Sequence, residues 1–167
     1  MPRPEREGRI SNVTELNEPV PSLRFDDLAA GMRLRLGTIT LTREEAIAFA
    51  ARYDPQPFHL DDAAAAENPL FGRLSASGWH TVVTMQILLG RYTKQAGLLG
   101  LAGGGVEDMR WVRPVFPPET LTVLLEVVAV RPSRSRPERG VLTMRTDALD
   151  DAGALAATLT VTGIFLR

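Results

Sequence analysis

Two side chains that can exchange protons lie close together on a proline-rich segment of the sequence. Asp54 and His59 are separated by four residues that include Pro55 and Pro57, and prolines stiffen the backbone around them. Free carboxyl and imidazole groups differ in pKa by about 2.6 units, so such a pair can hold opposite protonation states near neutrality. The pair predicts general acid–base chemistry, such as adding water to an activated double bond. The structural alternatives are a helix-stop or turn role for Asp54 and a buried structural role for His59.

A glycine supplies a third component that this chemistry needs. Gly78 stands at the start of the longest helical pattern in the sequence. Unpaired backbone amides at a helix start, together with the helix dipole, stabilise negative charge that develops on an oxygen atom. The alternative is that Gly78 only permits a turn or close packing. Together with Asp54 and His59, it defines a candidate catalytic site.

The elements that must position these residues indicate an α+β domain. Prolines and scattered charges without an apolar period predict a poorly ordered or wrapping arm at residues 1–22, followed by a single domain at 23–167. The apolar spacing predicts a strand at Met32–Leu41, a helix from Thr42 to about Tyr53, a short helix at Asp61–Glu67, a long helix after Gly78 that is buried on most sides, and strands at Val106–Val112, Thr120–Val130, Val141–Leu149 and Ala154–Leu166.

Several local patterns refine this prediction. Thr42 and Glu45 match a capping box, in which each side chain bonds the other's backbone amide. The segment 54–59 is expected to be irregular because of its prolines, Gly103–Gly105 is expected to break the chain, and Arg131–Gly140 is expected to be a loop. Strands that follow a buried helix predict one antiparallel sheet wrapped around it. Such a sheet leaves an unpaired edge, so we expect a homodimer or a higher homo-oligomer.

Composition excludes several classes of function. The chain has 167 residues and a formal net charge of −1, which gives no overall attraction to nucleic acid or to an anionic membrane. It contains no cysteine and only two histidines, so neither a disulfide nor a metal site is expected. No apolar leader or membrane-spanning run is evident. We therefore expect a cytoplasmic protein.

Two segments resemble a known family. Residues 53–61 (YDPQPFHLD) and 71–79 (FGRLSASGW) resemble the MaoC-like dehydratases, relatives of the (R)-specific enoyl-CoA hydratases with a hot-dog fold. The resemblance extends from about Phe25 through nearly the whole chain. It implies that Asp54 and His59 form the catalytic pair and that the Gly78 amide binds the thioester oxygen.

The sequence departs from the family pattern at three positions. Gln56 stands where the hydratases usually have asparagine, Ser77 replaces a histidine that commonly precedes the glycine, and Gln86 falls where they place a serine. Ser77 and Gln86 are therefore candidates for the oxyanion and substrate-binding part of the site. These changes bear on the substrate and the rate more than on the class of reaction.

The resemblance implies a hydro-lyase of fatty acid metabolism that acts on acyl thioesters. The expected reaction is hydration of a 2-enoyl-CoA or dehydration of a 3-hydroxyacyl-CoA, with coenzyme A or an acyl carrier as the thiol and no cofactor. The alternatives are an acyl-CoA thioesterase and a non-catalytic subunit that binds acyl thioesters. Four arginines are candidate contacts to coenzyme A, with solvated surface positions as the alternative: Arg110, Arg113, Arg134 and Arg136.

Overall fold

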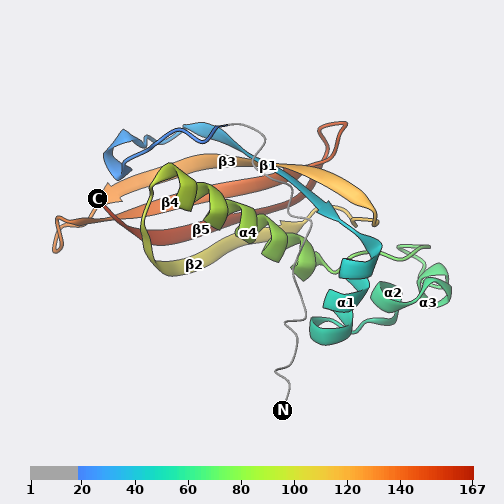
Figure 1. Cartoon of the computed structure of the whole chain (residues 1–167). Helices are drawn as coiled ribbons and strands as arrows, with labels where there is room; N and C mark the ends of the chain where they lie inside the picture. The colour runs from blue at the N-terminus through green and yellow to red at the C-terminus, as the bar shows by residue number, and fades with distance from the viewer. Residues whose placement is uncertain (1–18) are drawn as a thin grey trace, which may run out of the picture.

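A computed structural model describes residues 19–167, which form a five-stranded antiparallel sheet with one long helix against its face (Figure 1). The strands are β1 (Arg33–Leu41), β2 (Gly100–Trp111), β3 (Glu119–Pro132), β4 (Arg139–Leu149) and β5 (Leu155–Leu166). Their order in the sheet is β1-β3-β4-β5-β2, so β1 and β2 form the two edges. The predicted α+β class and antiparallel sheet are confirmed.

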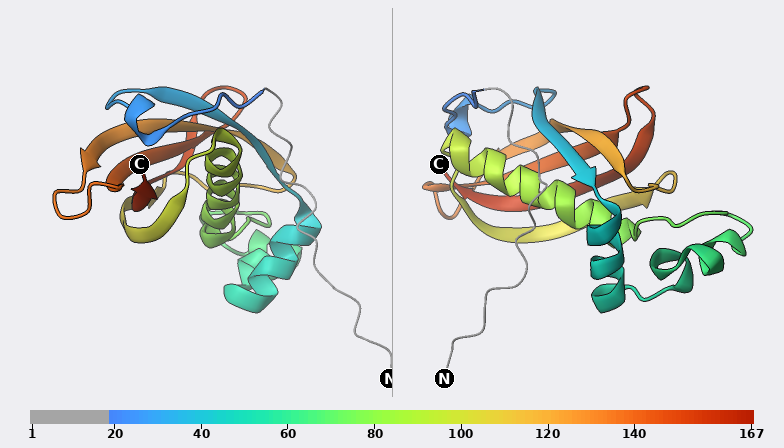
Figure 2. Two further views of the ribbon diagram at one scale, coloured as in Figure 1. Left: turned by 60° about the vertical axis from the view of Figure 1, so that its left-hand side comes forward. Right: turned by 45° about the vertical axis from the view of Figure 1, so that its right-hand side comes forward.

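The long helix α4 (Gly78–Ala96) crosses the inner face of the sheet, as both views in Figure 2 show. Alternate residues of β3 point toward it and are almost completely buried, as period-two patterning requires: Leu121, Val123, Leu125 and Val127. From α4 itself, Met85 and Leu88 are fully buried in the same hydrophobic core. The side chains between the helix and the sheet are the core of the domain.

Helix α4 contains nine buried residues, as the sequence predicts, but one stripe of it stays open. Trp79 is 50% exposed and Val83 is 42% exposed, and Gln86 and Gly90 continue the same stripe. Their spacing of four, three and four residues places all of them on one face of the helix. The described part of the chain therefore leaves a partly apolar helix face uncovered.

Helix α1 (Arg43–Tyr53) begins where the sequence predicts, but its capping box is only half formed. The Thr42 hydroxyl accepts a hydrogen bond from the Glu45 amide at 3.3 Å. The Glu45 carboxylate accepts from that same hydroxyl at 3.1 Å, and not from the Thr42 amide as the pattern predicts. A single threonine thus both caps the helix and holds the glutamate.

The segment 54–59, expected to be irregular, contains one turn of helix. Helix α2 (Pro57–Leu60) starts on Pro57, and a proline at the first helical position loses nothing because its amide would have no partner there. Gln56, directly before it, is extended, as the residue before a proline prefers. Helix α3 (Asp62–Ala66) follows, with the Asp61 side chain accepting from the Ala64 amide.

Two strand boundaries also differ from prediction. The glycines 103–105 do not break the chain but lie within β2, whose pairing with β5 shifts register at Gly100/Ala102, Gly103/Gly105 and Glu107/Arg110. Glycine is tolerated in a bulged edge strand, where the backbone must bend. The expected loop at 131–140 is shorter, because β3 and β4 stay paired as far as Pro132 and Gly140.

Most of the predicted N-terminal arm lies outside the described residues. The described part, from residue 19, leads into a short 3-10 turn at Phe25–Asp27. Leu23 donates its amide to the carbonyl of Ala96 at 2.7 Å, and Val20 and Leu23 pack against the core. This segment therefore covers the carboxyl end of α4.

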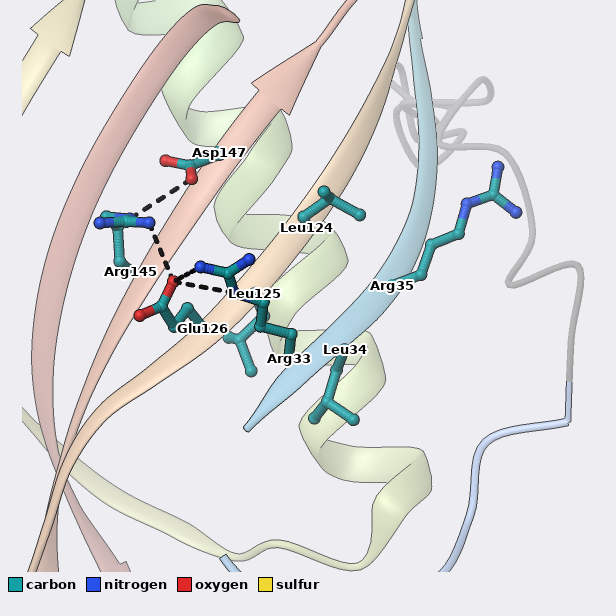
Figure 3. Close-up of a pocket in the computed structure, with 8 residues that line it drawn as sticks. All are labelled: Arg33, Leu34, Arg35, Leu124, Leu125, Glu126, Arg145 and Asp147. Atoms are coloured by element: carbon teal, nitrogen blue, oxygen red, sulfur yellow. Dashed lines mark hydrogen bonds and ion pairs between the residues drawn. The ribbon is translucent and has the colours of Figure 1, made fainter. Parts of the chain in front are cut away.

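The outer face of the sheet carries a network of ion pairs across β1, β3 and β4 (Figure 3). Glu126 accepts from both Arg33 at 3.2 Å and Arg145 at 2.9 Å, and Arg145 also lies 3.3 Å from Asp147. These side chains line a shallow hollow of about 260 Å³. Because its charged groups already pair with one another, we assign this hollow a structural role in joining the three strands.

Among residues 19–167, no helix has the length and apolar character needed to cross a membrane.

Candidate active site

Three short elements bring the candidate catalytic residues to the amino end of α4. Asp54 is the residue at which α1 ends, and His59 lies in the single turn of α2. The chain then returns through residues 74–77 into α4, which places Gly78 beside them. Figure 2 shows α1, α2 and α3 clustered beyond the end of the sheet, next to the start of α4.

The side chains of Asp54 and His59 face each other. The Nε2 atom of His59 lies 3.5 Å from the Oδ2 atom of Asp54. The His59 side chain is 8% exposed and that of Asp54 is 21% exposed, so both are shielded while the carboxylate still reaches solvent. A small proton acceptor or a water molecule can therefore meet both groups at one place.

Serine 75 fixes the orientation of the imidazole. The Nδ1 atom of His59 lies 2.7 Å from the backbone carbonyl oxygen of Ser75 and 3.2 Å from its hydroxyl. A carbonyl oxygen can only accept, so Nδ1 carries the hydrogen and donates it. In neutral His59, the lone pair is then on Nε2, the nitrogen that faces Asp54.

Serine 77 holds the carboxylate in a comparable way. Its hydroxyl donates to the Oδ2 atom of Asp54 at 2.7 Å and accepts from the amide of Trp79 at 3.2 Å. Ser77 is also the N-cap residue of α4. The carboxylate is thereby tied to the first turn of the long helix.

Gly78 is the first residue of α4, and within the described chain its amide has no hydrogen-bond partner. The side chain of Trp111 lies against it: a Cβ atom at this position would come within 2.5 Å of the indole ring. Trp111 in turn meets Trp79 edge-on, with ring centroids 5.1 Å apart. Close packing against the indole is therefore one physical reason for a glycine at this position. The unpaired amide is compatible with a second role, the binding of a substrate oxygen.

These groups line one pocket with a volume of about 350 Å³. Its polar side is formed by Asp54, His59, Ser75 and Gly78, and its other walls come from the end of β2, the segment 112–115 and the start of β5. The rest of the lining is mainly apolar and includes residues of these walls and of the segment before α4: Phe71, Ala76, Val112, Val115, Ala156 and Ala157. A mostly apolar pocket with a few convergent polar groups is the usual form of a small-molecule site.

The structure places Gln86 away from this pocket. It lies on the open stripe of α4 and lines a larger apolar groove of about 800 Å³ between α4, β2 and β5. Trp79 borders both the groove and the pocket. Contact between Gln86 and a substrate requires that the substrate reach past this tryptophan, and it stays a prediction.

The four candidate arginines are not brought together in the protomer. Arg110 is exposed at the end of β2 and pairs with Asp108 at 2.8 Å. Arg134 and Arg136 lie on the β3–β4 hairpin, at the end of the sheet opposite α1 and α2 (Figure 1). The pocket meets β5 at Ala156 and Ala157, whereas the hairpin adjoins Leu166 at the other end of that strand. At about 3.3 Å per residue, the two ends are roughly 30 Å apart. Their role in binding coenzyme A stays a prediction.

Arg113 lines the pocket but directs its guanidinium elsewhere. One nitrogen, Nη2, donates to Glu119 at 2.6 Å and to Asp150 at 2.8 Å, and Nη1 donates to the carbonyl of Pro114. The hydrogen bond to Glu119 is the main cause of a raised Arg113 pKa, whereas the pKa of Asp150 is lowered first by the Ala154 amide and also by Arg113. Arg113 thus joins the loop after β2 to the turn between β4 and β5.

The second histidine lies outside the pocket. His80 is 7% exposed and stacks on Phe49 of α1, with ring centroids 4.8 Å apart. Its burial lowers its pKa, and the nearby Glu45 carboxylate opposes this in part. Within the described residues, neither Nδ1 of His80 nor Oε1 of Glu45 has a hydrogen-bond partner. His80 therefore packs α1 against α4 and does not reach the candidate catalytic groups.

Two residues of the site were not singled out from the sequence. Ser75 orients His59, and Trp111 packs on Gly78. The spacing of Ser75 and Ser77 could have indicated the role of Ser75, because residues two apart in an extended segment point to the same side. No sequence signal connects Trp111 with Gly78, since their contact depends on how β2 lies beside α4.

With this geometry in place, comparison with known proteins assigns the family. The family model described as "MaoC like domain" matches residues 28–148. The chain belongs to this family, and the predicted resemblance is confirmed.

Individual relatives agree with the assignment and with the hot-dog fold. The crystal structure of a MaoC-like dehydratase from Rhodospirillum rubrum is 34% identical, covers 87% of this chain and 98% of its own, and has a TM-score of 0.75. The (R)-hydratase from A. caviae involved in PHA biosynthesis is 30% identical, with coverage of 84% and 98% and a TM-score of 0.65. The uncharacterized protein YdeM of Bacillus subtilis is 26% identical over 126 residues, which are 73% of this chain and 84% of YdeM.

Proposed function

We propose that this chain is a hydro-lyase that adds water reversibly to 2-enoyl thioesters, with coenzyme A or an acyl carrier as the thiol. The observation that carries the proposal is the approach of His59 Nε2 to Asp54 Oδ2 at 3.5 Å, in a pocket that also contains Gly78 at the start of α4. Membership of a family with dehydratase and hydratase relatives supports the same class of reaction.

The proposed reaction begins with a water molecule held by Asp54 and His59. As the water oxygen bonds to the β-carbon of the enoyl thioester, one of its protons passes to the free nitrogen of His59 or to the carboxylate of Asp54. The electron pair of the double bond moves toward the thioester oxygen. The Gly78 amide and the dipole of α4 stabilise the charge on that oxygen.

The second half of the reaction returns a proton to the substrate. The α-carbon takes a proton from the Asp54–His59 pair, which leaves the pair as it began, with one molecule of water added to the substrate. Dehydration follows the same steps in reverse. No step transfers electrons to an acceptor, so the proposed reaction needs no cofactor.

Two isosteric substitutions test the proposal. We expect Asp54→Asn and His59→Gln each to lower kcat for enoyl thioester hydration by roughly a hundredfold or more, the usual contribution of a positioned acid or base. Loss of the enoyl absorbance measures hydration, and a thiol reagent measures hydrolysis in parallel. Asp61→Asn is a matched control, because it keeps the cap of α3 and lies outside the pocket.

The outcomes separate the competing functions. Full hydration activity in both substituted proteins refutes the proposed roles. Thiol release without prior loss of the double bond indicates a thioesterase. Binding of acyl thioesters by calorimetry without turnover of any acyl chain indicates a non-catalytic binding subunit.

We also propose that the working form is a homodimer. Within residues 19–167, strand β2 is a free sheet edge that lies beside the open stripe of α4, so unpaired backbone groups and exposed apolar side chains adjoin. Leu101 and Val106 on β2 and Trp79 and Val83 on α4 are each more than 40% exposed. A charge at Val106, as in Val106→Lys, is expected to shift the protein toward monomer in sedimentation experiments, and an unchanged dimer contradicts this interface.

A further inference from the structure

The hydroxyl of Ser77 occupies a central position between the acid–base pair and α4. Ser77 is fully buried, with a relative exposure of 0%. Its oxygen lies 2.7 Å from Asp54 Oδ2 and 3.2 Å from the amide nitrogen of Trp79. Both contacts are within hydrogen-bonding distance, so the direction of each bond can be worked out from the donors available.

A hydroxyl has one hydrogen to donate. The Trp79 amide can only donate, so Ser77 accepts from it and directs its own hydrogen to Asp54. The oxygen that receives this hydrogen, Oδ2, is also the one that lies 3.5 Å from His59 Nε2. Ser77 therefore acts on the same carboxylate oxygen that faces the imidazole.

The hydroxyl is not placed to touch a substrate. Asp54, His59 and Gly78 line the pocket, whereas Ser77 does not. Its neighbours in sequence hold it in place, because the Ala76 amide donates to the carbonyl of Val115 at 2.8 Å. A group with no open surface acts on the reaction through the residue that it bonds.

We propose that Ser77 is a positioning residue, which holds the Asp54 carboxylate against His59 and connects it to the first turn of α4. This rests on the proposed hydro-lyase function, and it replaces the sequence-based expectation that Ser77 binds substrate directly. Through one hydroxyl, the carboxylate and the Gly78 amide keep a fixed relative placement, since Ser77 is the residue directly before Gly78. Catalytic groups need such support because small displacements carry large losses in rate.

A test must separate this role from the capping of α4. Ser77→Ala removes both the cap and the bond to Asp54. Ser77→Gly removes the bond but retains most of the cap, because glycine is well tolerated at that position. Thr42→Ala is the matched control: it removes the cap of α1, which leads to Asp54, and leaves the Ser77 hydroxyl in place.

We expect both Ser77 variants to lose kcat by roughly ten- to a hundredfold, with little change in KM, because the hydroxyl orients a catalytic group without touching substrate. Their thermal midpoints should differ, with Ser77→Ala the lower. Thr42→Ala should lose thermal stability and keep its kcat. Unchanged kcat in both Ser77 variants overturns the proposal, as does a rise in KM that accounts for the loss in kcat/KM.

A spectroscopic measurement keeps the test independent of turnover. The sequence contains only His59 and His80, so the imidazole ¹⁵N spectrum has few signals. We expect Ser77→Gly to move the signals of His59 and to leave those of His80 in place. Unmoved His59 signals overturn the positioning role. Shifted signals in a protein without hydratase activity support that role and refute the proposed function instead.

Discussion

Adding a methyl group at Gly78 tests whether this glycine is required for packing, for catalysis, or for both. In Gly78→Ala, the new Cβ would lie 2.5 Å from the indole of Trp111. Carbon atoms in contact lie about 3.5–4.0 Å apart, so the ring must move away by about 1 Å. Overpacking of this kind costs about 1–3 kcal/mol, and we expect the lower half of that range because Trp111 is 46% exposed and can swing outward.

A double-mutant cycle with Trp111→Ala isolates the packing contribution. Once the indole is removed, Gly78→Ala should no longer be destabilising, because a helix prefers alanine over glycine by up to about 1 kcal/mol. Urea denaturation measures the four free energies of unfolding. Among the four proteins, only Gly78→Ala is expected to have a displaced Trp111 ring, which tryptophan fluorescence should detect. Trp79, the other tryptophan, is present in all four proteins and contributes fluorescence to each.

The same four proteins separate packing from oxyanion binding when their kcat values are compared. If Gly78→Ala is inactive only while Trp111 is present, the glycine serves to seat the indole. If the substrate needs the space beside the Gly78 amide, the alanine methyl group lowers kcat whether or not Trp111 is present. A Gly78→Ala protein with wild-type stability and unchanged fluorescence refutes the steric reasoning altogether.

Two further predictions concern residues outside the acid–base pair. Burial lowers the pKa of His80 from its ordinary value of 6.5. Between that lowered pKa and 6.5 the unfolded chain binds more protons than the folded one, so the folded state should lose stability as the pH drops through this window. The melting temperature of His80→Gln should depend less on pH there, and a pH dependence identical to that of the unsubstituted protein contradicts the assignment. Arg113→Lys should lower the free energy of unfolding by about 1–2 kcal/mol, because lysine cannot keep both carboxylate contacts. Arg110→Lys, at an exposed ion pair, should change it by less than about 0.5 kcal/mol. Urea denaturation measures both, and equal effects of the two substitutions refute this prediction.

The sequence predicted those parts of the fold that depend on local pattern. The apolar alternation of β3 to β5 and the threonine that caps α1 were sufficient for the strands and the helix, and the two short motifs were sufficient for the family. Predictions failed where tertiary context overrides local preference. The glycines of β2 look like a break, yet pairing with β5 keeps them extended, and Pro57 looks like a helix breaker although it begins α2.

The candidate site follows the same division. Asp54, His59 and Gly78 were identified from spacing, and the structure brings them to one pocket. The contacts that hold these residues were not predictable, because the hydrogen bond from His59 to Ser75 spans 16 residues of sequence and the packing of Trp111 on Gly78 spans 33. Only the path of the chain through the sheet places these partners next to the catalytic groups.

His59 and Asp54 differ in how strongly a substitution of the residue that orients them would affect them. His59 is oriented by the backbone carbonyl of Ser75, and every amino acid has that carbonyl, so substitutions at position 75 preserve the acceptor. Asp54 is oriented by the side chain of Ser77, which a single codon change can remove. Over evolutionary time the imidazole is therefore robust to drift in its neighbour, whereas the carboxylate offers a point at which its environment can be retuned.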